Sequence, residues 1–259
     1  MKKLLVLFFP TFLFISLGFS SLKEGASLFE KESTMTTTTF QSKDGLTITA
    51  DVYATKNPDA PWILLFHQAG YSRGEYRGIA PKLNEMGFNC MAIDQRSGEG
   101  VNNVENETHK AATNKNMKTK YPDAYPDLEA ALLHVKSKFH SKKTIIWGSS
   151  YSASLVFILG SKYKEDVSAI AAFSPGEYFT FEGKKIADFA KSIECPVFIT
   201  SSASEKKDWK NIYESLSSKI KIGFLPSSEG FHGSKALWET KDGNEEYWKS
   251  LSKFLENQL

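Results

Sequence analysis

Short apolar segments of strand length alternate with segments of helical periodicity along most of the chain. Continuous apolar runs predict strands at 62–66, 88–93, 144–147, 167–173, 197–200 and 220–225. Apolar residues at helical spacing predict helices at 79–86, 126–139, 152–162, 186–193, 209–216 and 248–255. Strands that are apolar throughout are typical of a parallel sheet covered by helices on both faces. The pattern therefore predicts a doubly wound α/β domain.

Two further features describe the N-terminal part of the chain. Residues 36–40 and 46–53 are rich in Thr, Ile and Val, and Lys43-Asp44-Gly45 between them predicts a β-hairpin. Lys2 and Lys3 precede a largely apolar stretch at 4–19 that ends in small residues, the pattern of a secretory signal peptide. We expect residues 1–21 to direct export to the periplasm or medium and to be cleaved, 22–35 to form a flexible leader, and 36–259 to form one domain. An uncleaved membrane anchor is the alternative, but the stretch is shorter than the roughly 20 apolar residues of a span and contains Pro10.

The charge balance restricts the partners. The chain has 32 Lys and Arg against 30 Asp and Glu, and Lys2 and Lys3 lie in the expected signal peptide. A chain without net charge is a poor candidate for general nucleic-acid or acidic-membrane binding. It also lacks an H-E-x-x-H sequence, a cysteine cluster, a Walker A motif and a full G-x-G-x-x-G, so no metal or organic cofactor is expected. We expect a small-molecule substrate; the sequence leaves the oligomeric state open.

A nucleophile-elbow pattern follows the expected strand 144–147. Gly148-Ser-Ser-Tyr-Ser152 fits G-x-S-x-G with Ser in the last place. Small residues two before and two after the nucleophile let the strand and the helix approach, and Gly148 and Ser152 meet that need around Ser150. Centring the motif on Ser149 would put Trp147 and Tyr151 at those crowded positions, so Ser149 is the weaker candidate.

A serine nucleophile needs a base and an acid that orients the base. Of the five histidines, His232 alone lies in a glycine-flanked loop after a late strand, in Gly230-Phe-His-Gly233. The acid is expected after the strand 197–200, where Glu205 is the first carboxylate. Asp208, expected as a helix cap, and Glu177 are the alternatives.

The developing oxyanion needs two donors. The amide of Tyr151, next after the nucleophile, is one candidate. The second is expected from His67-Gln-Ala-Gly70 after the strand 62–66. Within that segment we favour the amide of Ala69 over that of Gln68.

These pieces resemble the α/β-hydrolase superfamily, in particular its small lidless members that are similar to dienelactone hydrolases and esterases. The resemblance rests on His67-Gln-Ala-Gly70, Asp94-Gln-Arg-Ser-Gly98, the elbow, Pro196–Glu205 and the His232 loop, which follow one another in the family's order. It implies an α/β-hydrolase fold without a cap domain and a serine hydrolase with a Ser150–Glu205–His232 triad. This hydrolase would cleave an ester, thioester or amide. Gln68, Ser152 and Glu205 depart from the family's commonest residues.

The resemblance also bears on the cysteines, which each begin an apolar run. It places the strands that Cys90 and Cys195 begin on opposite halves of the sheet, too far apart for a disulfide. Both thiols are therefore expected to be free.

Two questions stay open at the level of sequence. The polar segment 97–121 has no clear periodicity, and we expect a mobile loop that borders the pocket mouth. The function itself has alternatives: a non-catalytic ligand-binding protein on the same fold, or a peptidase for short peptides.

Overall fold

A computed structural model describes residues 1–2 and 35–259. The predicted signal peptide and leader lie almost wholly outside these residues. The first strand begins at Met35, one residue before the predicted start of the domain. No helix in the described part of the chain combines the length and apolarity needed to cross a membrane.

One eight-stranded sheet forms the centre of residues 35–259, in the order β1-β2-β4-β3-β7-β8-β9-β10. The hairpin strands β1 and β2 pair antiparallel, β2 is antiparallel to β4, and all later pairs are parallel. This confirms the predicted N-terminal hairpin and mostly parallel sheet. The strand bounds are β1 Met35–Gln41, β2 Thr47–Tyr53, β3 Trp62–Phe66, β4 Asn89–Ile93, β7 Thr144–Ser149, β8 Ala169–Phe173, β9 Val197–Thr200 and β10 Lys221–Phe224.

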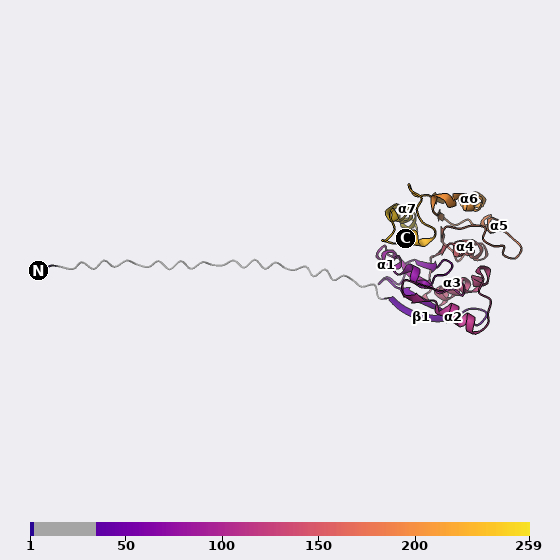
Figure 1. The fold of residues 1–259 in the computed structure, drawn as a ribbon, viewed down its shortest axis with the longest axis horizontal. Helices are drawn as coiled ribbons and strands as arrows, with labels where there is room; N and C mark the ends of the chain where they lie inside the picture. The colour runs from indigo at the N-terminus through magenta and orange to yellow at the C-terminus, as the bar shows by residue number, and fades with distance from the viewer. Residues whose placement is uncertain (3–34) are drawn as a thin grey trace. The chain divides into compact units, whose positions relative to one another are not determined.

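Helices cover the two faces of this sheet unequally. The helices are α1 Ala80–Glu85, α2 Glu107–Asn114, α3 Tyr125–Phe139, α4 Tyr151–Lys162, α5 Ile186–Ala190, α6 Lys206–Ser215 and α7 Asn244–Glu256. Buried side chains of α1 and α7 form one core with the sheet, and those of α3, α4, α5 and α6 form the other. In Figure 1, α1 and α7 accordingly lie on one side of the folded part and α3 to α6 on the other.

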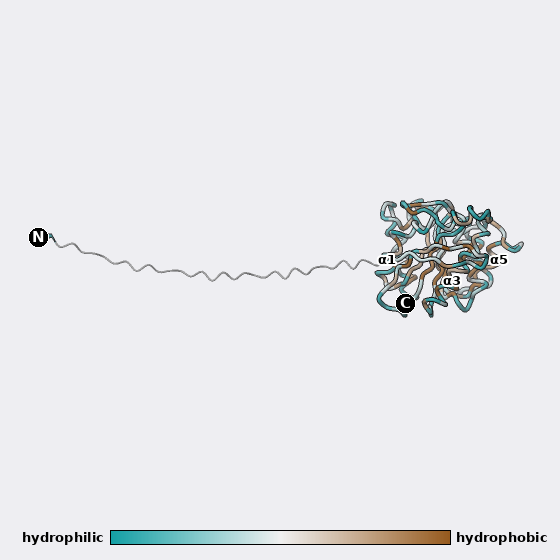
Figure 2. Tube along the Cα trace, turned by 90° about the horizontal axis from the view of Figure 1, so that it is seen from below, coloured by the Kyte–Doolittle hydropathy of each residue, from teal (hydrophilic) through white to brown (hydrophobic). Residues whose placement is uncertain are grey.

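Burial on both faces explains why the central strands are apolar throughout. In β3, Ile63 and Leu65 belong to the core under α1 and α7, whereas Leu64 and Phe66 belong to the opposite core. Side chains of a strand alternate between faces, so a strand covered on both sides needs apolar residues at every position. Figure 2 shows the same arrangement, with hydrophobic segments inside and hydrophilic ones at the periphery.

The segment 97–121 is folded, and the expectation of an unstructured loop is wrong. It contains the hairpin β5 Gly100–Val101 and β6 Val104–Glu105 and the helix α2. Asn102 and Asn103 both have positive φ, 52° and 59°, as a two-residue hairpin turn requires. Asn106 then caps α2 by accepting a hydrogen bond from the His109 amide at 2.7 Å. The asparagines were the signals in the sequence that a search for apolar periodicity passes over.

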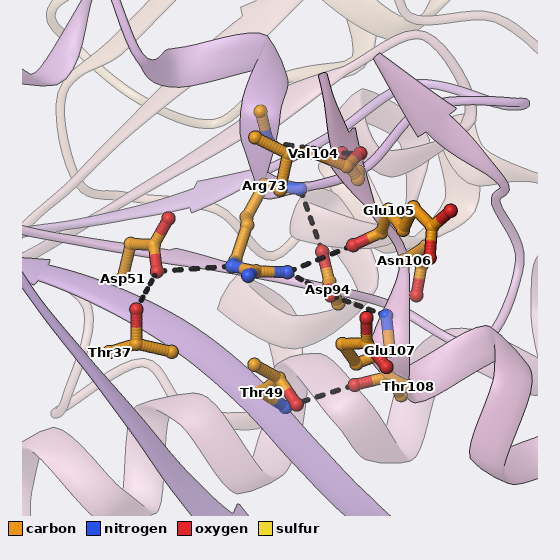
Figure 3. Close-up of polar contacts among 12 residues, drawn as sticks. Thr37, Thr49, Asp51, Arg73, Asp94, Val104, Glu105, Asn106, Glu107 and Thr108 are labelled. Carbon is orange, nitrogen blue, oxygen red and sulfur yellow. Dashed lines mark hydrogen bonds and ion pairs between the residues drawn. The ribbon is translucent and has the colours of Figure 1, made fainter. Parts of the chain in front are cut away.

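Hydrogen bonds tie this segment to the sheet (Figure 3). The Glu107 amide donates to Asp94 Oδ2 at 2.8 Å, and the Thr49 amide donates to Thr108 Oγ1 at 3.0 Å. Arg73 Nη1 donates to the Glu105 carbonyl at 3.0 Å. These hydrogen bonds join the segment to β2, to the end of β4 and to Arg73, and they argue against the predicted mobility of residues 100–114.

Arg73 is the hub of that anchoring. Its guanidinium lies 3.0 Å from Asp51 Oδ1 and 2.6 Å from Asp94 Oδ2, and both carboxylates are almost fully buried. Removing the cation leaves two buried carboxylates without their counter-charge, which typically costs about 3–5 kcal/mol.

We therefore expect Arg73→Met to lower the free energy of unfolding by about 3–5 kcal/mol in urea titrations. Arg77→Met is the matched control, because Arg77 is exposed and, within the described part of the chain, its guanidinium makes a single hydrogen bond, 3.4 Å long, to the Asn102 carbonyl. The control should change stability by less than about 1 kcal/mol. Equal effects of the two substitutions would show that the buried ion pairs do not hold the fold.

Both cysteines are free, as predicted. Cys90 lies buried in β4 and Cys195 lies half-buried just before β9. The strands β3, β7 and β8 separate the two strands in the sheet.

Candidate active site

The strand β7 and the helix α4 meet in a turn that admits no side chain at Gly148. A Cβ placed there would lie 2.3 Å from the Ser152 carbonyl oxygen, closer than atoms can approach. Ser150, at the apex, has φ 58° and ψ −123°, a strained conformation for a residue with a side chain. Its amide is held by the Phe173 carbonyl of β8 at 2.7 Å. These features are those of a nucleophile elbow centred on Ser150.

The neighbouring serines point elsewhere. The Ser149 hydroxyl is fully buried and donates to Glu75 Oε1 at 2.8 Å. The Ser152 hydroxyl, in the place where the family commonly has Gly, donates to the His67 carbonyl at 2.6 Å. Ser152 thus binds the elbow to the end of β3, and of these three serines Ser150 is the one at the apex of the turn.

Three predicted residues come together at the carboxyl ends of the strands. His232 Nε2 lies 2.8 Å from Ser150 Oγ, and His232 Nδ1 lies 2.5 Å from Glu205 Oε1. Ser150 follows β7, Glu205 follows β9 and His232 follows β10. The side chains of His232 and Glu205 are 34% and 23% exposed, so the imidazole lies where a substrate can reach it.

The Glu205 carboxylate is held by more than the imidazole. Its Oε2 accepts hydrogen bonds from Ser174 Oγ at 2.7 Å and from the Ser202 amide at 3.2 Å. Burial alone raises the pKa of Glu205, but the hydrogen bonds from His232 and Ser174 outweigh it and hold the pKa below its usual value. The carboxylate is therefore ionised at neutral pH.

The alternative acids are placed differently. Asp208 lies exposed in the first turn of α6, where it is not the cap that the sequence suggested. Glu177 accepts the amides of Ile186 and Ala187 at 2.7 and 2.9 Å, at the start of α5. Glu205 is the carboxylate that contacts His232.

The hydrogen bonds of the loop after β3 distinguish Gln68 from Ala69, the two candidates for the second oxyanion donor. The Gln68 amide donates to the buried Glu75 Oε2 at 2.8 Å, so its hydrogen is already bonded within the protein. Among the hydrogen bonds of the described residues, the Ala69 amide donates none. Tyr151 opens α4, so its amide is one of the helix N–H groups without a partner in the helix. The arrangement favours Tyr151 and Ala69.

His67, in the same loop, is a structural residue. Its Nε2 accepts the Gln95 amide at 2.9 Å, and its Nδ1 lies 2.8 Å from the Gln68 carbonyl. Full burial lowers the pKa of His67 to about 4. The ring is therefore neutral, with its proton on Nδ1, and it fixes the loop rather than reacting.

Tyrosines border the three residues. The Tyr121 ring stacks on that of Tyr151 with centroids 4.6 Å apart. Tyr178 donates its hydroxyl to the Ser174 carbonyl at 2.8 Å, and burial raises its pKa to about 12. Tyr121 and Tyr178 are 39% and 42% exposed and so are open to a ligand.

Sequence reasoning missed three residues of this site. Ser174 directly follows β8 and has φ 54°, so its place at a strand's carboxyl end was a usable signal. Gln95 follows β4, and its side-chain amide donates to the Tyr151 and Ser152 hydroxyls at 2.9 and 2.8 Å. Glu75 lies within a short 3₁₀ turn, Arg73–Tyr76, and no local pattern marks it.

Ser174 offers a specific test. Its hydroxyl donates to Glu205 and accepts the Gly233 amide at 2.9 Å, which links the acid to the His232 loop. We expect Ser174→Ala to lower kcat about tenfold, the effect of one lost hydrogen bond to a charged group. Losing a donor also raises the pKa of Glu205, although the carboxylate stays ionised at neutral pH. A kcat within about twofold of the wild-type value would contradict this role.

Comparisons with known proteins agree with the geometry. Residues 57–214 match the family described as serine aminopeptidase, S33. An esterase of Pyrococcus furiosus is 17% identical, with a TM-score of 0.67 over 87% of this chain and 93% of that chain. A dienelactone hydrolase of Anabaena variabilis is 12% identical, with a TM-score of 0.67 over 87% of this chain and 98% of that chain. No curated protein matches the chain in sequence.

At these identities the two solved structures support the fold alone. They confirm the predicted α/β-hydrolase fold. Residues 174–185, which join β8 to α5, contain no helix and no inserted domain, in agreement with the prediction of a capless member.

Proposed function

Because the chain belongs to the serine aminopeptidase S33 family of the α/β hydrolases, we propose that it is a serine hydrolase that cleaves an ester, thioester or amide of a small substrate through an acyl-enzyme. The observation that carries the proposal is the chain of contacts Ser150 Oγ–His232 Nε2–Glu205, made at 2.8 and 2.5 Å. A hydroxyl in contact with an imidazole that a carboxylate orients is the arrangement that activates serine.

The proposed reaction has two halves. Ser150 Oγ attacks the acyl carbon while its proton passes to His232 Nε2, and His232 then gives that proton to the leaving alcohol, thiol or amine. In the second half a water attacks the acyl-enzyme, His232 takes its proton, and the acid leaves as Ser150 regains a proton. Glu205 accepts the Nδ1–H of His232 and stabilises the imidazolium in both halves.

The oxyanion of each tetrahedral intermediate would be stabilised by the amides of Tyr151 and Ala69. Ala69 follows Gln68 and Tyr151 follows Ser150, and hydrogen bonds hold both of these preceding residues. The two donor amides therefore need no rearrangement when charge develops. The residues of this site require no metal or organic group for the steps above.

Labelling with a fluorophosphonate tests the mechanism. We expect an adduct on the intact protein, and peptide mapping should place it on Ser150 rather than on Ser149 or Ser152. Lack of any adduct would favour the alternative of a ligand-binding protein on this fold.

The family's description favours a peptidase for short peptides as the second candidate. An aminopeptidase cleaves aminoacyl p-nitroanilides, whereas an esterase prefers p-nitrophenyl esters of simple acids. Values of kcat/KM for both series, measured on residues 36–259, separate the two. A large preference for the anilides would replace the esterase assignment while leaving the acyl-enzyme intact.

We also propose that the protein is exported through residues 1–21. The support is the charge and apolarity of that segment. The N-terminal sequence of the protein recovered from the cell envelope or medium would test it, and a mature protein that still begins at Met1 would contradict cleavage.

A further inference from the structure

Glu75 is a carboxylate buried behind the proposed active site. It has no exposed surface, and the proposed reaction does not use it. Burying a charged group is costly, and an apolar residue would serve packing better. The contacts that it makes therefore have to explain its presence.

Each carboxylate oxygen accepts one hydrogen bond from a different loop of the site. Oε2 accepts the amide of Gln68, and Oε1 accepts the hydroxyl of Ser149, both at 2.8 Å. Gln68 precedes the proposed donor Ala69, and Ser149 precedes Ser150. The carboxylate thus fixes the peptide that aims one oxyanion donor and the strand end that carries the nucleophile.

The contacts extend to the loop that carries His232. Ser149 Oγ accepts the Ser234 amide at 2.8 Å, and the Trp238 indole donates to the Glu75 carbonyl at 2.9 Å. The approach is tight, since a Cβ at Gly233 would lie 2.6 Å from Ser149 Oγ. Glu75 therefore links the loop that carries Ala69, the elbow that carries Ser150 and the loop that carries His232.

We propose that Glu75 is a positioning residue whose ionised carboxylate holds these three loops in their reactive arrangement, so that the hydrolase is fully active only when Glu75 has lost its proton. The proposal rests on the proposed serine-hydrolase function. An ionised carboxylate suits the site because both of its neighbours are donors. A protonated one has to donate from one oxygen, and the bond from Ser149 is then lost or reversed.

The surroundings of Glu75 set the pH at which this occurs. Burial raises the pKa of Glu75 to about 7, although the Gln68 and Ser149 hydrogen bonds lower it. His232, when it carries a proton, and Lys235 face it, and both act in the lowering direction. Tyr71 and Tyr76 are the other titratable groups near it, and they remain neutral because burial raises their pKa values.

The first test is the pH dependence of kcat/KM for the wild-type protein with a p-nitrophenyl ester. A catalytic imidazole and Glu75 must both lose a proton, so the acid limb of the logarithmic plot should approach a slope of 2. Glu75→Gln should reduce that slope to 1. We also expect kcat to fall about 10–100-fold with KM within about threefold, since misplaced oxyanion donors affect the transition state more than binding.

Asp94→Asn is the matched control. It also converts a buried carboxylate to an amide, and burial raises the pKa of Asp94 to about 6. The Asp94 carboxylate contacts Arg73 and the Glu107 amide rather than a loop of the site. This variant should lose stability but keep the wild-type slope.

Ser149→Ala supplies an independent measurement. It removes the link between Glu75 and the Ser234 amide, so it should lower kcat in the wild type and add little in the Glu75→Gln background. If Glu75→Gln does not fold, the wild-type slope and Ser149→Ala still decide. A wild-type slope of 1 overturns the dependence on loss of the Glu75 proton, and additive effects of the two substitutions overturn the positioning role.

Fluorophosphonate labelling separates this failure from failure of the proposed function. A wild-type protein that is labelled on Ser150, combined with additive effects of Glu75→Gln and Ser149→Ala, refutes only the role of Glu75. A wild-type protein that is not labelled refutes both.

Discussion

Replacing Ser150 by alanine is expected to lower kcat by about 10⁶, the effect of removing the nucleophile from a serine hydrolase whose triad acts as a unit. The variant retains the proposed oxyanion donors, so a small residual rate above that in water should remain. The measurement is ester hydrolysis with enough protein to exclude contamination, together with fluorophosphonate labelling, which should disappear.

Ser137→Ala is the control for this substitution. Ser137 is exposed on α3, and among residues 35–259 its hydroxyl has one hydrogen bond, to the His134 carbonyl at 3.3 Å. Both variants should unfold at nearly the wild-type temperature, because alanine fits either site without a cavity. Activity above about 1% in Ser150→Ala would move the nucleophile to another residue, despite the geometry of the elbow.

The parts of the fold that the sequence predicted are those in which local pattern and burial coincide. Strands β3 and β7 were found to within two residues because burial on both faces makes them apolar throughout. The elbow could be predicted because its steric requirements concern five consecutive residues, and glycine is the one residue type that fits at position 148. Such features can be read from a short stretch of sequence because they do not depend on how distant parts of the chain pack.

The segment 97–121 was mispredicted because its order does not come from an apolar face. Its turn depends on Asn102 and Asn103, and its position depends on Arg73 and Asp94, which lie outside the segment. Glu75 was not predicted as a residue of the site for a related reason. A Glu in a polar stretch is normally solvated, and only the packing of four separate segments buries this one.

The proposed triad lies between these cases. The order of Ser150, the acid and His232 along the chain follows from the fold, but the choice among Glu205, Asp208 and Glu177 depends on which side chain reaches the imidazole. The structure distinguishes them through partners in other segments: Ser174 holds Glu205, whereas Glu177 binds the start of α5.

Glu205→Gln is expected to lower kcat by 10²–10⁴ while the fold is retained, on the order found for the equivalent amide exchange in serine proteases. The amide has the shape of the carboxylate but presents an NH₂ group to one of two donors, His232 Nδ1 and Ser174 Oγ. If the NH₂ faces the imidazole, Nδ1 accepts and Nε2 carries the proton, so His232 cannot take the proton of Ser150. The neutral amide also fails to stabilise the imidazolium in the transition state.

Asp208→Asn is the matched control for this prediction. Asp208 also follows β9 but is exposed in the first turn of α6 and does not contact His232. Its carboxylate interacts favourably with the N-terminal end of α6, so the exchange should cost at most about 1 kcal/mol of stability and change kcat by less than about tenfold. Should Asp208→Asn be the more damaging of the two, Glu205 would be a structural residue that holds the His232 loop, and the acid of the triad would have to reach the imidazole by a rearrangement of α6.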